Sequence, residues 1–237
     1  AVIETGLGGR LDATNVVDPI ASIITSVSLD HENILGDNLA QIAGEKAGII
    51  KSQCPIFLGK NPDIVQKVVE QKSQLINAPY VYVPKKVKIE DVRFRGMSQR
   101  VRCSLAGQAI EVELPLLGQH QVENFTNVLA SLDELGFNLD ASIIQNGLDN
   151  MIWQGRMQAL QKEPLVLYDV AHNPEGLTRL LDSLQELGKT NSIIVAAFNA
   201  RKNIQPMLDL LNKWSGEVIF TAFSGHSAVE KETLVHL

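Results

Sequence analysis

The sequence predicts an α/β protein with parallel strands, because three apolar runs each end in a carboxylate or an imidazole followed by a turn. These runs are Ala1–Glu4, Ser22–His31 and Pro164–His172. A strand buried in a parallel sheet reads as a nearly continuous apolar run, and ligands of open α/β sheets bind beyond the carboxyl ends of the strands. One acid at a strand end is usually an ordinary surface residue, but three such ends favour a site. The candidate site residues at these ends are Glu4, His31, Asp169 and His172.

The composition is that of an ordinary globular protein and argues against some classes of partner. Of the 237 residues, 45% are hydrophobic and 20% are charged, which is typical of a globular chain. The net charge of −6 and the pI of about 5.4 argue against a nucleic-acid or anionic-membrane surface. Phosphate ligands remain compatible with an acidic chain, because metal ions and backbone amides can hold them.

The cysteines and the two ends of the chain indicate its setting. Cys54 and Cys103 are too few for a disulfide framework, which favours a reducing cytoplasm. No apolar run approaches the roughly 20 residues of a membrane span, and no signal peptide opens the chain. Because the chain starts without Met inside an expected strand and stops in what could be a first helical turn, we expect a piece of a longer polypeptide.

The first part of the chain alternates between strand and helix patterns. The expected strands are 1–4, 20–29 and 55–58, and the expected helices are 38–51 and 61–75. Apolar residues in the first helix follow helical spacing, and Asp37 or Asn38 is available as its N-cap.

From about residue 80 to residue 116 the pattern changes to a period of two. This alternation predicts a small antiparallel insertion with a hairpin turn at Ala106–Gln108. Helices are expected at about 121–135, where Gly136 ends the helix, and at about 140–150.

After Trp153–Arg156 the alternation of strands and helices restarts. The expected strands are 164–170, 192–198 and 217–222, and the expected helices are 174–187 and 203–214. This second set of elements has its own periodicity, so we expect a second core and a domain boundary near 153–157.

Taken singly, the candidate residues leave alternatives open. Glu4 and His31 are a plausible metal pair, but histidine is an unusual Mg²⁺ ligand, so the residues alone favour Zn²⁺ or a structural histidine. Lys46 on a helix is normally a solvated charge. Asn124 near a helix start is more often a cap than a ligand. Arg156 could clamp a phosphate or be a surface linker residue.

The turn after the first expected strand, Gly6–Gly9, suggests a close backbone approach to an anion. Glycine turns after strands are common, and this one lacks the full dinucleotide-binding spacing. The 237 residues contain no Gly-x-x-x-x-Gly-Lys-Ser/Thr loop.

Six sequence blocks, taken in order, carry a resemblance to a known family. They are Val2–Val17, Ile24–His31 with Leu35-Gly36, Ile42–Lys51, Leu117–Asn124, Trp153–Arg156 and Asp169–Pro174. Together they closely resemble the folylpolyglutamate synthase/dihydrofolate synthase family of the Mur ligase superfamily. The resemblance implies a partial Mur-ligase-type ATP-binding central domain over 1–152, with the β insertion at about 80–116. It implies an incomplete, Rossmann-like glutamate-ligase domain over 157–237.

The same resemblance implies an ADP-forming ligase that uses ATP and Mg²⁺ to add L-glutamate to dihydropteroate or tetrahydrofolate through an acyl phosphate. Glu4 and His31 then resemble Mg²⁺ ligands near the γ-phosphate, in place of the Zn²⁺ reading. Lys46 resembles a lysine that is carbamylated in this superfamily and engages a second Mg²⁺. The whole enzyme is expected to be a cytoplasmic monomer without nucleic-acid or membrane partners.

The remaining roles implied by the resemblance concern the nucleotide and the incoming amino acid. Asn124 resembles an adenine contact, and Arg156 a hinge arginine that reaches the ATP phosphates. Asp169 resembles a ribose-side or hinge contact, and His172 lies where the family places the cleft for the incoming glutamate. Lys46, Arg156 and His172 are thus the expected catalytic residues.

The chain departs from the family pattern in three places. The phosphate-binding loop is absent from these residues, Val170 replaces a glycine, and Ala200–Asn203 replaces a segment rich in carboxylates. We therefore expect the 237-residue chain alone to be inactive. The competing hypotheses are another Mur ligase that acts on a peptidoglycan precursor, and a non-catalytic fragment.

Overall fold

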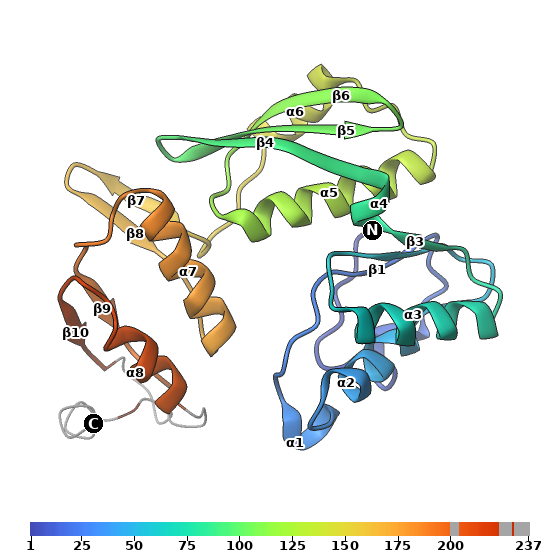
Figure 1. Cartoon of the computed structure of the whole chain (residues 1–237), viewed down its shortest axis with the longest axis horizontal. Helices are drawn as coiled ribbons and strands as arrows, with labels where there is room; N and C mark the ends of the chain where they lie inside the picture. The colour runs from blue at the N-terminus through green and yellow to red at the C-terminus, as the bar shows by residue number, and fades with distance from the viewer. Residues whose placement is uncertain (200–203, 223–228, 230–237) are drawn as a thin grey trace. The chain divides into compact units, whose positions relative to one another are not determined.

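The computed structural model describes residues 1–199, 204–222 and 229 (Figure 1). The chain forms two compact units. The first comprises residues 1–115 and 120–151, and the second comprises residues 116–119 and those described from Ile152 onward. No helix within the described ranges combines the length and the apolar character that crossing a membrane requires.

The first unit contains a parallel sheet of three strands in the order β1-β2-β3. The strands are β1 (Ser22–Ile24), β2 (Ile56–Leu58) and β3 (Tyr80–Tyr82). All three residues of the central strand β2 are buried, as expected for an apolar run in the middle of a parallel sheet. The same part of the chain contains three α-helices: α1 (Glu32–Leu35), α2 (Leu39–Lys46) and α3 (Asp63–Leu75). It also contains the 3-10 helices η1 (Ala13–Val16) and η2 (Ala47–Ile49).

Helices α2 and α3 cover one side of the sheet (Figure 1). Ile42 of α2 and Val65 and Val69 of α3 are buried in one core with the sheet residues Ile56 and Leu58. The predicted helix at 38–51 is confirmed as α2 followed by η2, and the Asn38 side chain is its N-cap, accepting a hydrogen bond from the Gln41 amide.

Two sequence predictions in this unit are wrong. Residues 1–3 are apolar, but residues 1–4 form no strand, because a strand requires a ladder partner and the described structure gives them none. Tyr80–Tyr82 pairs in parallel with β2 and is not part of the antiparallel sheet, although its alternation suggested so. The strand predicted at 20–29 is confirmed only over Ser22–Ile24.

The predicted antiparallel sheet is confirmed in the order β4-β5-β6. After α4 (Val83–Lys86), its strands are β4 (Val87–Arg95), β5 (Ser98–Leu105) and β6 (Gln108–Leu114), and the predicted hairpin turn joins the last two. In β5 the side chains alternate, with Val101 and Cys103 buried and Arg102 exposed. Figure 1 shows α5 (Gln119–Glu134) between the two sheets of this unit, while α6 (Ala141–Asp149) follows it in the chain.

The second unit contains a hairpin and a parallel pair of strands. β7 (Gln158–Lys162) pairs antiparallel with β8 (Leu165–Tyr168), and β9 (Ile194–Ala196) pairs in parallel with β10 (Val218–Phe220). In the chain, α7 (Pro174–Glu186) lies between β8 and β9, and α8 (Gln205–Leu211) lies between β9 and β10. The core includes Leu177, Phe198, Met207, Leu208 and Leu211. The sequence did not predict β7. Residues Ala200–Asn203, where the sequence departs from the family pattern, lie outside the described residues.

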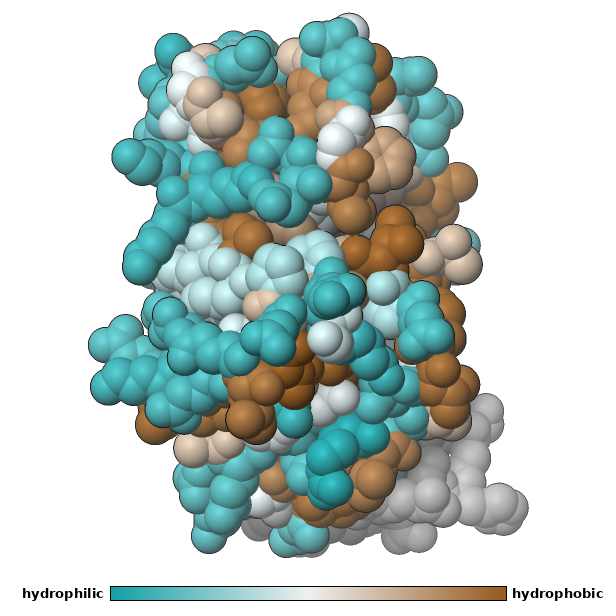
Figure 2. Space-filling model, turned by 90° about the vertical axis from the view of Figure 1, so that its right-hand side faces the viewer, coloured by the Kyte–Doolittle hydropathy of each residue, from teal (hydrophilic) through white to brown (hydrophobic). Residues whose placement is uncertain are grey.

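The first 35 residues expose many apolar side chains. The exposed ones are Val2, Ile3, Leu7, Leu11, Val16, Ile20, Ile23, Leu29 and Ile34. Figure 2 shows hydrophobic residues lying among hydrophilic ones on one face of the molecule. Exposed apolar residues alone do not define a site, because much of any folded surface is apolar. With so few of its apolar side chains buried, this segment depends on polar contacts for its conformation.

Candidate functional site

The turn that follows Glu4 is closed by the carboxylate of Asp12. Its Oδ2 accepts hydrogen bonds from the amides of Gly6 (2.9 Å) and Leu7 (3.2 Å). Its Oδ1 accepts from the amide (2.9 Å) and the hydroxyl (2.5 Å) of Thr14. These bonds, chiefly those from Thr14, lower the pKa of Asp12 to about 2. Both carboxylate oxygens therefore hold the loop together.

The same loop is bound to the end of α2. The Arg10 amide donates to the Glu45 carbonyl at 2.9 Å. The Arg10 guanidinium donates to both Glu45 carboxylate oxygens, from Nε to Oε2 at 3.1 Å and from Nη2 to Oε1 at 2.9 Å. Gly9 has φ +153°, and a Cβ there would lie 3.1 Å from the Glu45 carbonyl oxygen and 2.9 Å from the Ile49 side chain. The sequence suggested that this turn approaches an anion; in the structure Gly9 lets the loop pack against the helix.

The two expected metal ligands are both exposed in the first unit. Glu4 lies outside any helix or strand, just before the loop. His31 follows β1 with φ +53°, its amide donates to Asp30 Oδ1 at 2.8 Å, and its Nε2 lies 3.9 Å from that oxygen. The described residues contain no group of three or more His, Cys, Asp or Glu side chains able to hold a metal by themselves. Mg²⁺ commonly takes one or two protein carboxylates and completes its shell with water and phosphate oxygens, so the single carboxylate of Glu4 is a donor of the kind that it takes.

Lys46 is the last residue of α2 and is half-buried. It directly follows Glu45, whose carboxylate is bound by Arg10. The structure therefore attaches the loop after Glu4 to the turn of helix that presents Lys46.

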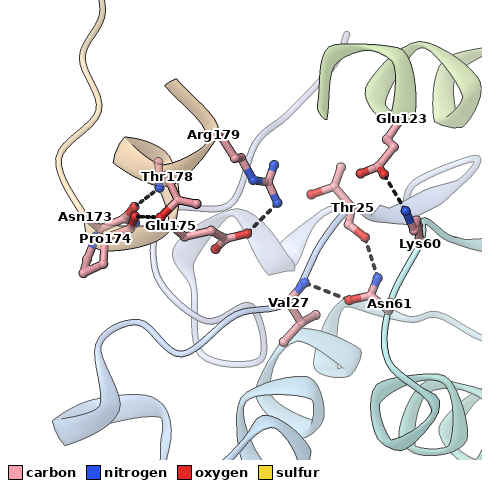
Figure 3. Close-up of polar contacts among 11 residues, drawn as sticks. Thr25, Val27, Lys60, Asn61, Glu123, Asn173, Pro174, Glu175, Thr178 and Arg179 are labelled. Carbon is pink, nitrogen blue, oxygen red and sulfur yellow. Dashed lines mark hydrogen bonds and ion pairs between the residues drawn. The ribbon is translucent and has the colours of Figure 1, made fainter. Parts of the chain in front are cut away.

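The ends of β1 and β2 are joined by the buried side chain of Asn61. Its Oδ1 accepts from the Val27 amide at 2.8 Å, and its Nδ2 donates to the Thr25 carbonyl at 2.6 Å (Figure 3). The same Nδ2 also donates to the Gly59 carbonyl at 3.1 Å. The ammonium of Lys60 lies 3.2 Å from a Glu123 carboxylate oxygen, which ties α5 to the end of β2.

Asn124 is therefore carried by a helix that is fixed at the strand ends. Its side chain is exposed, and its Nδ2 donates to Gln121 Oε1 at 3.1 Å. One turn further along α5, Asn127 is buried beside Gly59, and its Oδ1 accepts no hydrogen bond from the described residues. Asn124 thus lies between two residues of α5, Glu123 and Asn127, that lie beside the segment following β2, and ligands of parallel sheets bind beyond such strand ends.

In the second unit, Asp169 joins two of the sequence blocks. Its Oδ2 accepts from the Met157 amide and its Oδ1 from the Ala171 amide, both at 2.8 Å. The Val170 amide donates to the Gly155 carbonyl at 3.0 Å. Gly155 has φ +73°, and a Cβ there would lie only 2.9 Å from Val170 Cγ1. The segments Gly155–Met157 and Asp169–Ala171 are therefore packed closely against each other.

Arg156 and His172 lie directly next to these hydrogen-bonded residues. Both side chains are exposed; Arg156 Nη1 donates to the Gly155 carbonyl at 3.2 Å, and His172 Nδ1 lies 3.1 Å from the Val170 carbonyl oxygen. Directly after His172, α7 begins with Asn173 as its N-cap, accepting from the Gly176 amide at 2.8 Å, and Figure 3 shows this cap with the Glu175–Arg179 ion pair.

In each unit, hydrogen bonds join two segments that carry candidate residues: the loop after Glu4 and the end of α2 in the first unit, and Gly155–Met157 and Asp169–Ala171 in the second. Sequence reasoning missed the residues that make such contacts in the first unit: Arg10, Asp12, Glu45 and Asn61. Asn61 directly precedes Pro62, and this pair predicted only the start of a helix. The sequence did not indicate that the Asn61 side chain binds the backbone at the ends of two strands. For Arg10 and Glu45, 35 positions apart, no spacing rule predicts contact.

Comparison with known proteins identifies the class. Residues 1–132 match the Mur ligase middle domain. Residues 155–236 match the family described as Mur ligase, glutamate ligase domain. These matches and the α/β fold define a Mur ligase.

The sequence is similar to several characterised proteins. It is 31% identical over 216 residues to folylpolyglutamate synthase of Lacticaseibacillus casei, covering 89% of this chain and 50% of that protein. It is 32% identical over 229 residues to dihydrofolate synthase/folylpolyglutamate synthase of Bacillus subtilis, covering 94% of this chain and 53% of that one. The chain therefore spans about half the length of the curated relatives it matches.

Solved structures agree with the sequence matches. A folylpolyglutamate synthase complex with AMPPCP and folate superposes with a TM-score of 0.87 at 27% identity, over 99% of this chain and 58% of that one. Mycobacterium tuberculosis folylpolyglutamate synthase with ADP gives 0.88 at 29% identity, over 98% of this chain and 53% of that one. The chain belongs to the folylpolyglutamate synthase/dihydrofolate synthase family of the Mur ligase superfamily.

Proposed function

We propose that the complete protein is an ATP-dependent, ADP-forming ligase that adds L-glutamate to a folate, either dihydropteroate or tetrahydrofolate. The observation that carries this proposal is the likeness to the folylpolyglutamate synthase complex with AMPPCP and folate over 99% of the chain. That likeness includes both units, and each unit contains candidate residues.

The reaction follows from the poor reactivity of a carboxylate toward an amine. An oxygen of the acceptor carboxylate attacks the γ-phosphorus of ATP, which forms an acyl phosphate and releases ADP. The amine of L-glutamate then attacks the acyl carbon, the carbon–oxygen bond to phosphate breaks, and the amine loses a proton as the amide forms. Positioning of three substrates and stabilisation of phosphoryl charge supply the rate.

In the first unit we assign Glu4 and His31 to Mg²⁺ and Asn124 to the adenine. Bound Mg²⁺ would neutralise charge on the phosphate oxygens. We assign Lys46 as a carbamate, which converts a cation at the end of α2 into an anion with oxygen donors suited to Mg²⁺. The support for the assignments of Glu4, Lys46 and Asn124 is local: the loop after Glu4 is bound to the end of α2, and the neighbour of Asn124, Glu123, pairs with Lys60 after β2.

In the second unit Arg156 would contact ATP phosphates and His172 the incoming glutamate. With Nδ1 as donor to the Val170 carbonyl, Nε2 of His172 keeps its lone pair and can accept a proton from the attacking amine. Asp169 would act at the ribose side while its carboxylate also holds the backbone of both neighbours.

The remaining parts of the proposal concern organisation and location. We assign residues 1–152 to the central ATP-binding domain and 157–237 to the glutamate-ligase domain. We propose that the complete enzyme works as a monomer in the cytoplasm, where Cys54 and Cys103, both unpaired and buried, would stay reduced.

The test is an assay of ADP release by the complete polypeptide. We expect ADP release that requires both L-glutamate and dihydropteroate or tetrahydrofolate. The 237 residues alone should show none, because they contain no phosphate-binding loop. ADP release that depends on a peptidoglycan precursor and not on a folate would assign the protein to another Mur ligase activity, and full activity of the 237 residues would refute the role given to the missing loop.

A further inference from the structure

The loop after Glu4 and the helix that presents Lys46 are connected by one pair of side chains. Glu4 lies two positions before Gly6, whose amide is bound by Asp12, and Glu45 directly precedes Lys46. Arg10 belongs to the loop and Glu45 to the helix, so their bidentate contact joins the segments that carry two of the candidate residues.

The Arg10–Glu45 contact differs from an ordinary surface ion pair. Exposed pairs usually contribute little, because two long side chains must be ordered in water. Here the geometry is bidentate, which is the stronger form, and the backbone is fixed as well. Arg10 donates its amide to the Glu45 carbonyl at 2.9 Å, and the Arg10 carbonyl accepts from Asn15 Nδ2 at 3.0 Å.

A second set of bonds holds the far side of the loop. Asn15 Nδ2 also donates to the Gly48 carbonyl at 3.1 Å, and Lys51 Nζ donates to the Asn15 carbonyl at 2.7 Å. The loop is thereby bound at the end of α2 and again just beyond it. Because the backbones of Arg10 and Glu45 are already held side by side, the two side chains start close together and need only be ordered to form their contact.

We propose that Arg10 and Glu45 are a positioning pair that fixes Glu4 relative to Lys46 in the ligase reaction. This inference rests on the proposed function. The pair contacts no substrate in the proposal; it sets the separation of the segments that carry two charged groups of the site. A shift of about 1 Å between such groups can cost about a hundredfold in rate.

The test uses the complete enzyme with Arg10→Gln and Glu45→Gln, and with the exchanged pair Arg10→Glu/Glu45→Arg. Each single variant should lower kcat about ten- to a hundredfold and raise the Mg²⁺ concentration for half-maximal rate, with KM for the folate unchanged. The exchanged pair should recover much of the loss. Arg102→Gln is the matched control, because Arg102 is equally exposed (55%) and pairs with Glu90 at 3.2 Å on the antiparallel sheet.

A second measurement is independent of activity. Amide hydrogen exchange of residues 5–12 should be faster in Arg10→Gln than in the wild type or in Arg102→Gln. Unchanged exchange would overturn the inference even if the wild type proves not to be a ligase. Single variants with kcat within twofold of the wild type and an unchanged Mg²⁺ requirement would overturn it as well. A wild type without glutamate-dependent ADP release would instead refute the proposed function.

Discussion

The carboxylate of Asp169 accepts a hydrogen bond from the backbone amide of Met157, with 2.8 Å between Oδ2 and N. Its other oxygen accepts from the Ala171 amide at the same distance. Arg156 directly precedes Met157 and His172 directly follows Ala171. One carboxylate therefore fixes the backbone beside two side chains that we assign to phosphate and to glutamate.

Replacing Asp169 by Asn should weaken the hydrogen bonds to the backbone of Met157 and Ala171. The amide group has one acceptor oxygen, so one backbone N–H would face an NH₂ group and lose its partner. We expect a loss of about 1–3 kcal/mol in the free energy of unfolding and a lower kcat. Thermal unfolding and the ADP-release assay measure both. Asp182→Asn, at an exposed position of α7, is the control; equal stability of the two variants would contradict the role of Asp169.

Gly155→Ala should destabilise the second unit. The new methyl group would lie 2.9 Å from Val170 Cγ1, and φ of +73° is unfavourable for alanine. We expect a cost of about 1–3 kcal/mol in the free energy of unfolding. Gly147→Ala is the matched control, since its Cβ position in α6 lies more than 4 Å from any atom outside the adjoining helix backbone, and it should stabilise by about 0.5–1 kcal/mol. Equal effects of the two variants would show that the contact of position 155 with Val170 and its positive φ do not disfavour alanine there.

The Asp12 loop should weaken in acid. Because the folded-state pKa of Asp12 is lowered to about 2 from 3.8, its contribution to stability is complete above about pH 4 and is lost as the pH falls toward 2. Melting temperatures between pH 5 and 2 should therefore fall less steeply for Asp12→Asn than for the wild type. Parallel curves would show that the carboxylate does not stabilise the fold.

How far the sequence predicted the fold depended on how local each signal was. The spacing of apolar residues and the Asn38 cap predicted α2, and alternation predicted β5 and β6, because each signal lies within the element itself. Strand pairing is not local: residues 1–3 are apolar but have no ladder partner in the described structure, and Tyr80–Tyr82 alternates yet pairs in parallel. β7 escaped notice because its side chains are mostly exposed and follow no apolar pattern.

The candidate site shows the same division. Positions after strands and near helix starts singled out His31, Asn124 and His172, and the order of the sequence blocks gave the resemblance that implied their roles. The residues that hold them are brought close only by folding, as Asp169 and Met157 are across 12 positions. Their roles in the reaction stay predictions.

Lys46→Ala in the complete enzyme should abolish most ligase activity. Short carboxylic acids such as acetate or propionate should restore part of it, because they can supply the oxygen donors of the lost carbamate. The measurement is kcat with and without added acid, with chloride at equal ionic strength as the control. A variant with the wild-type kcat would refute the role of Lys46.

We propose that the complete protein joins glutamate to a folate through an acyl phosphate. The most direct measurement uses a folate acceptor whose reacting carboxylate carries oxygen-18, followed by mass analysis of the inorganic phosphate formed. An acyl phosphate requires the labelled oxygen that attacked the γ-phosphorus to leave with phosphate when the amine attacks. We predict one labelled oxygen in each phosphate molecule at complete labelling; phosphate free of label, formed along with glutamylated folate, would contradict the mechanism.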